Sequence, residues 1–132
     1  MKIISDLRSV NNLDELLEVD EIIIPTEYSI LRECVPSEEE IHKVISWCIY
    51  QGKKACLRVD RIIEEVYLVS FYKFLDKFCD YDINFVFSDL CVLSYFKEKK
   101  MIHKLIYNAP TYMANYFDIK YYPQRNYKKQ SV

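Results

Sequence analysis

The chain has 132 residues, of which 51% are hydrophobic and 29% are charged, so it fits one globular domain with a real core and not a disordered chain. Eighteen basic and 20 acidic residues give a net charge of −2, which argues against a general nucleic-acid binder because such proteins carry a basic face. The single glycine, Gly52, is too few for the standard glycine-rich loops that cradle nucleotides.

The cysteines and the N-terminus indicate a cytoplasmic protein. The five cysteines are odd in number and lack CxxC spacing, so we expect reduced thiols rather than a disulfide framework. Asp6 comes too early for a signal peptide, and no apolar run is long enough to cross a membrane. His42 and His103 stand alone, so we expect no metal site and no cofactor. A Cys–His hydrolase stays open, because such partners meet only in space.

The N-terminal part of the chain predicts two strands and a short helix. Residues 2–5 form the first expected strand, and a helix follows from Asn12, where Asn12 and Glu15 resemble a capping box. The second expected strand covers residues 20–24. An irregular connection follows over residues 25–36.

The middle of the chain has the clearest helix signals. Ser37 and Glu40 form a second capping box, which begins an amphipathic helix with its apolar residues at helical spacing: Ile41, Val44, Ile45, Cys48 and Ile49. Gly52 supplies a left-handed stop. Residues 55–59 then alternate as a third strand.

Two more strands are expected in the C-terminal half. A helix over residues 66–79 precedes a strand over 83–87. Asp89 can cap the next helix, which carries Leu90, Leu93 and Phe96 at helical spacing, with Val92 beside them. A fifth strand covers residues 105–107, and a last short helix is expected over 111–116, just after Pro110.

Polar residues follow the carboxyl ends of the expected strands. Asp60, the pair Ser88–Asp89 and Asn108 end the third, fourth and fifth strands, and Glu27 lies just after the second. The repeated order of strand, polar tip and helix is typical of α/β folds, in which ligands bind at the carboxyl ends of parallel strands. We therefore expect an α/β fold, either a partial TIM-like (β/α) barrel or an open parallel sheet of about five strands with four to five helices.

Three segments carry a resemblance to a known family. They are the helix and strand of residues 37–60, the strand and turn of residues 82–93, and the strand and turn of residues 104–116. In order and spacing over residues 2–119, the chain resembles the collagenase-like peptidase family U-thirty-two. Cys91 stands where that family usually has glycine.

The resemblance implies a (β/α)₈ barrel and places this chain as a truncated or divergent member of the family. Members of the family include putative proteases and proteins needed to hydroxylate RNA bases or quinone precursors, some of which hold an iron–sulfur cluster on cysteines. The expected domain is the N-terminal part of the barrel over residues 1–119. A basic, tyrosine-rich tail over residues 120–132 follows.

The strand ends supply the candidate site. Asp60 and Asp89 are the candidate catalytic residues, and Glu27, Ser88 and Asn108 are candidate substrate-binding residues. Each has a structural alternative. Asp60 would start a loop and pair with Arg61, Asp89 and Asn108 would cap helices, and Glu27 would be a loop acid.

Two functions from different classes follow. The first is a shortened U-thirty-two-like protein that hydrolyses peptides or acts with the RNA-modification machinery, as the resemblance implies. The alternative is a non-catalytic binding or assembly module that pairs through its open sheet edge with another protein or a second copy of the chain. A small phosphate-sensing regulator is a third hypothesis, and the scarcity of glycine weighs against it.

We expect no membrane partner. The tail is expected either to contact RNA or an acidic partner, or to be solvated.

Overall fold

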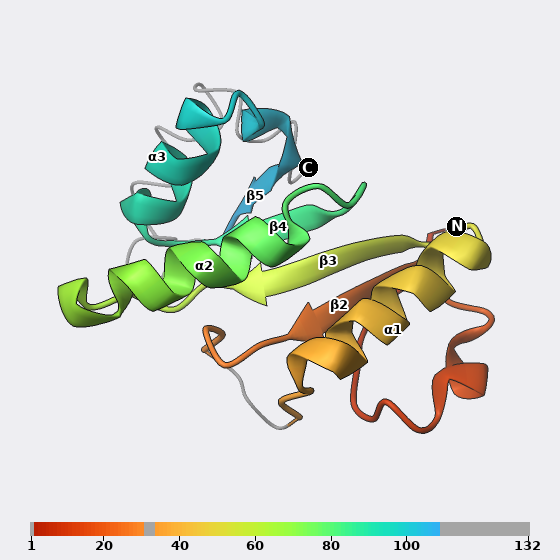
Figure 1. The fold of residues 1–132 in the computed structure, drawn as a ribbon. Helices are drawn as coiled ribbons and strands as arrows, with labels where there is room; N and C mark the ends of the chain where they lie inside the picture. Colours follow the sequence, from red (N-terminus) through yellow and green to blue (C-terminus); the bar gives the residue numbers. More distant parts are fainter. Residues whose placement is uncertain (1, 31–33, 109–132) are drawn as a thin grey trace, which may run out of the picture.

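The sheet contains five parallel strands in the order in which they occur along the chain (Figure 1). The computed structural model describes residues 2–30 and 34–108. The strands are β1 (Ile4–Asp6), β2 (Glu21–Pro25), β3 (Lys54–Val59), β4 (Asn84–Phe87) and β5 (Leu105–Tyr107). The predicted α/β fold with a five-stranded parallel sheet is confirmed.

Three α-helices of the described chain connect the last four strands. They are α1 (Glu38–Tyr50), α2 (Leu68–Phe78) and α3 (Leu90–Glu98), and short 3₁₀ turns lie at Leu13–Leu16, Glu65–Tyr67 and Ile102–Lys104. Crossovers between parallel strands are right-handed. Because each new strand is added on the same side of the previous one, all three crossovers carry their helices to one face of the sheet. Figure 1 shows α1 and α2 across that face.

The core lies between this face and the helices. Alternate strand residues, among them Ile22, Ile24, Leu57 and Phe85, are fully buried beneath the helices. The ring of Phe96 on α3 packs 4.8 Å from the ring of Phe85. Strand side chains alternate between the two faces. The intervening residues therefore lie on the opposite face, which no helix of the described chain covers; we call it the open face.

The predicted ends of α1 are confirmed. Ser37 Oγ accepts a hydrogen bond from the Glu40 backbone N–H at 3.2 Å, and Glu40 Oε1 accepts one from the Ser37 N–H at 2.8 Å. At the other end, Gly52 has a φ of 72° and its N–H donates to the Ile49 carbonyl. A side chain would be strained at this φ, so the only glycine of the sequence stands where the backbone needs one.

Other predicted helix features are wrong in detail. Asn12 makes no side-chain capping bond, and a 3₁₀ turn follows it instead of an α-helix. The inward stripe of α3 contains Val92 and Phe96, which are completely buried, whereas Leu90 is 68% exposed. Residues four apart share a helix face and residues two apart do not, so Leu90 points away from the core when Val92 points into it.

Two predictions concern the part of the chain after β5. The predicted helix over residues 111–116 and the tail over 120–132 lie outside the described residues. Among the described residues, no helix is both long and apolar enough to span a membrane.

Candidate functional site

Asp60 is a buried carboxylate at the carboxyl end of β3. Its side chain is 1% exposed. Oδ1 accepts a hydrogen bond from the Ile30 backbone N–H at 2.9 Å, and Oδ2 accepts one from Asn108 Nδ2 at 2.8 Å. Arg58 Nη1, two residues earlier on the same side of β3, lies 3.0 Å from Oδ2 and forms an ion pair. The predicted partner Arg61 is therefore wrong, because strand alternation turns Arg58 and Asp60 to one face.

Asn108 and Ser88 belong to the same cluster. The Asn108 backbone N–H donates to the Phe87 carbonyl at 2.7 Å, and the Ser88 hydroxyl donates to the Asn108 carbonyl. The structure thus brings together three of the five candidate residues: Asp60, Ser88 and Asn108. All three lie where β3, β4 and β5 end, as expected for the carboxyl edge of a parallel sheet.

Asp89 has a different role from Asp60. Its Oδ1 accepts from the Cys91 backbone N–H at 3.0 Å and caps α3, as the structural alternative predicted. Its Oδ2 accepts from the Ile63 backbone N–H at 2.8 Å, which ties the β3–α2 connection to the start of α3. Both oxygens are therefore engaged in holding backbone.

Glu27 is not part of the Asp60 cluster. It is exposed and lines a separate cavity with Tyr28 and with residues of the segment 61–67. Its backbone carbonyl accepts from Arg61 Nη1 at 3.0 Å.

The Asp60 cluster is built to hold elements together. The carboxylate already accepts from a backbone amide, a guanidinium and a side-chain amide, which come from three separate parts of the chain. Protonation of this carboxylate, as a general base requires, would weaken bonds that hold three segments of the chain together inside a buried site. Among residues 2–30 and 34–108, no group of three or more His, Cys, Asp or Glu side chains is placed to hold a metal ion.

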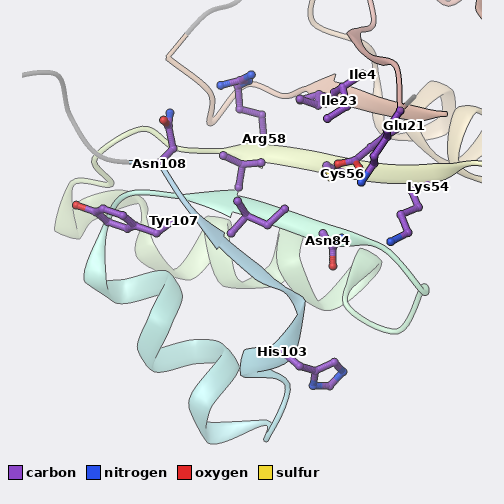
Figure 2. Close-up of a pocket in the computed structure, with 13 residues that line it drawn as sticks. Ile4, Glu21, Ile23, Lys54, Cys56, Arg58, Asn84, His103, Tyr107 and Asn108 are labelled. Carbon is purple, nitrogen blue, oxygen red and sulfur yellow. Dashed lines mark hydrogen bonds and ion pairs between the residues drawn. The ribbon is translucent and has the colours of Figure 1, made fainter. Parts of the chain in front are cut away.

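The open face forms a trough of about 630 Å³ (Figure 2). Tyr107 and Asn108 lie at its carboxyl end, and Glu21 and Lys54 lie at the opposite end. Each strand contributes one apolar or weakly polar side chain to a diagonal row across this face: Ile4, Ile23, Cys56, Val86 and Ile106. Charged side chains lie on both sides of this row.

Glu21 is a buried acid that lines the trough. Its carboxylate accepts from Cys56 Sγ at 3.0 Å and forms an ion pair with Lys2 at 2.9 Å. Burial alone would raise the pKa of Glu21, but the hydrogen bonds from Cys56 and Lys2 and the charges of Lys2 and Lys54 hold its pKa below the ordinary value. Glu21 therefore stays ionised as a structural anion.

Four of the five thiols have raised pKa values. Burial raises the pKa of Cys48 to about 11 and that of Cys91 to about 12, and it raises the pKa values of Cys34 and Cys56 as well. A reactive cysteine needs a lowered pKa. His42 is engaged elsewhere, because its Nδ1 lies 2.7 Å from the Tyr81 hydroxyl and its ring stacks on Phe78. A Cys–His hydrolase therefore has no support in the described chain.

Sequence reasoning missed Arg58, Glu21 and Lys54. A signal for them exists, since all three alternate with the buried apolar residues of β2 and β3 and so must share the other face of the sheet. The alternation does not predict which side chain pairs with each charged residue, because that side chain lies on another strand or connection.

Comparisons with known proteins give no match: no family model fits the sequence, and no curated protein or solved structure is similar to it.

Replacing Asp60 by alanine should strongly destabilise the fold. The substitution leaves Arg58, Asn108 and the Ile30 N–H without their buried acceptor, so we expect the free energy of unfolding to fall by about 3–5 kcal/mol. Denaturant unfolding measures this loss. Asp82→Ala, at an exposed acid, is the control and should change stability by less than about 0.5 kcal/mol. Equal effects of the two substitutions would contradict the role of Asp60.

The thiols should react slowly in the folded protein. With a pKa of about 11, Cys48 is only about one-thousandth thiolate at pH 8 even where reagent can reach it. Titration with Ellman's reagent should detect all five thiols after denaturation, whereas in the native state half-buried Cys34 should react first. Cys34→Ser should remove that first phase. Rapid labelling of Cys56 in the native protein would contradict this prediction.

Proposed function

We propose that this domain is a non-catalytic assembly module that pairs with a second copy of itself through the free edge at β1. The observation that carries the proposal is the combination of an open sheet face with a free edge strand, at whose start two isoleucines are exposed. In the described chain β1 has a neighbouring strand only on its β2 side, and Ile3 and Ile4 at this edge are 45% and 53% exposed. An edge strand presents unpaired backbone N–H and C=O groups, which can pair with a strand of another chain.

A two-fold axis gives this pairing a definite geometry. Two copies related by such an axis present the same surface to each other, so β1 would lie antiparallel to the β1 of the second copy. The sheets would then continue into one another. Ile4 would leave solvent at this interface, and the apolar row that begins at Ile4 would extend into the second copy.

The state of the carboxyl edge also supports a non-catalytic role. Asp60 and Asp89, the two candidate catalytic carboxylates, each use both oxygens to hold the protein's own groups. Four cysteines have raised thiol pKa values. These features favour binding over catalysis.

A second candidate is U-thirty-two-like activity, either peptide hydrolysis or a role in RNA modification. The gathering of Asp60, Ser88 and Asn108 at the carboxyl edge favours it, because this is where barrel enzymes place their reacting groups.

Substitution at the edge strand tests the proposed pairing. Ile4→Lys places a charge on β1, and we expect it to convert the dimer to a monomer or to raise its dissociation constant at least tenfold. Ile49→Lys is a matched control, since Ile49 has nearly the same exposure, 50%, but lies on α1. Gel filtration with light scattering measures the mass. A wild-type chain that stays monomeric with a normal melt, or equal effects of both variants, would refute the proposal.

A turnover assay tests the second candidate. The candidate predicts that the chain cleaves fluorogenic gelatin-derived peptides and that Asp89→Asn reduces the rate at least tenfold. Asn is also a good helix cap and keeps an acceptor for the Cys91 N–H, so the fold should survive the substitution. A melting curve of the variant serves as the control. No cleavage above the buffer blank would refute peptide hydrolysis, and an unchanged rate in Asp89→Asn would refute a catalytic role of Asp89.

A further inference from the structure

A second cavity lies at the carboxyl edge, between the β2–α1 and β3–α2 connections. Its volume is about 220 Å³. Glu27 and Tyr28 form one wall, and residues 61–64 with Tyr67 form the other; we call it the tyrosine pocket. It is smaller than the roughly 300–1,000 Å³ of typical small-molecule sites. Its size therefore suits one inserted side chain better than a whole cofactor.

Backbone contacts hold the two walls in place. The Arg61 backbone N–H donates to the Tyr28 carbonyl at 3.0 Å, and Arg61 Nη1 donates to the Glu27 carbonyl at 3.0 Å. The Tyr28 N–H donates to Thr26 Oγ1 at 3.0 Å, and Asp89 holds the Ile63 N–H. A pocket fixed in this way loses little conformational freedom when it is filled.

Two tyrosine rings line the pocket, and one of them is rigid. The Tyr28 ring packs against Phe71 at 4.8 Å and against Phe74 at 5.1 Å between ring centroids. Tyr67 on the opposite wall is 54% exposed. The face of a tyrosine ring attracts a cation placed within about 6 Å of its centre.

The charges of the lining also favour a cation. Glu27 and Glu64 contribute two negative charges against the one positive charge of Arg61, which leaves −1. The guanidinium of Arg61 contacts a backbone carbonyl through Nη1, so this bond does not neutralise either carboxylate. Glu65, next in the chain, adds another exposed acid. A positive group entering here would meet two tyrosine side chains and two carboxylates.

The surroundings of the pocket are apolar. Ile62 is 64% exposed, Val66 is 77% exposed and Val69, one turn of chain further on, is 67% exposed. Exposed apolar residues grouped beside a cavity are typical of protein-binding surfaces. These apolar side chains would make no contact with a small free cation, but they can contact the residues that flank a cationic side chain in a polypeptide.

We propose that the tyrosine pocket binds a lysine or arginine side chain of another polypeptide, whose apolar neighbours rest on Ile62 and Val66. The charged end lies between Tyr28 and Tyr67 and within reach of the Glu27 and Glu64 carboxylates. This inference is separate from pairing at β1, which uses a different edge of the molecule.

An NMR titration of the ¹⁵N-labelled full chain tests the proposal. The probe is the peptide acetyl-Leu-Lys-Leu-amide, and its neutral match is acetyl-Leu-Gln-Leu-amide. We expect saturable shifts at the amides of residues 61–67 with the lysine peptide and at least tenfold weaker binding of the glutamine peptide. Equal binding of the two peptides, shifts confined to other residues, or no saturable shift at millimolar peptide would overturn the proposal.

Two variants and a control locate the effect. Glu64→Gln removes one carboxylate and Tyr67→Leu removes one ring face, and each should weaken the lysine peptide at least threefold. Glu18→Gln changes an exposed acid that precedes β2, at the opposite edge of the sheet, and should leave the affinity unchanged. Unchanged affinity in both pocket variants would overturn the assignment. Repeating the titration with Ile4→Lys should give the same affinity, whatever the outcome for pairing at β1.

Discussion

The arrangement at the carboxyl edge depends on one buried anion, the side chain of Asp60. A carboxylate that is 1% exposed is stable only when its charge and lone pairs are satisfied. Arg58, Asn108 and the Ile30 N–H do this, and they come from β3, the end of β5 and the connection after β2. The requirement of one side chain therefore fixes three segments that are remote from one another in sequence.

The sheet has two unlike regions. At the ends of β3 and β4, the oxygens of Asp60 and Asp89 accept hydrogen bonds from the protein's own donors. On the open face, by contrast, the described helices leave the sheet uncovered and the row from Ile4 to Ile106 reaches solvent in part. Exposed apolar rows of this kind are typical of surfaces that contact another chain, and this is the ground for the proposed pairing.

The sequence predicts helices, strands and helix caps better than it predicts which side chains pair across the sheet. The strand over residues 105–107, the capping box at Ser37 and the cap at Asp89 depend on neighbouring residues, and all three are confirmed. The pairing of Asp60 with Arg58 and Asn108 depends on which faces meet across the sheet, and the sequence did not predict it. Leu90 shows the same limit within a helix, because it lies two residues before Val92 of the inward stripe and is exposed despite its hydrophobicity.

Glu27 and Asp60 illustrate how the carboxyl edge separates two roles that look alike in sequence. Both acids follow a strand, but Asp60 shares its face with Arg58 and is drawn into the interior, whereas Glu27 lies in a connection and is exposed. Arg61 bonds the Glu27 backbone carbonyl, and the Glu27 carboxylate interacts with the Tyr28 side chain at the surface. The acid at the strand end therefore serves the fold, whereas the exposed acid lies outside the sheet, beside the tyrosine rings.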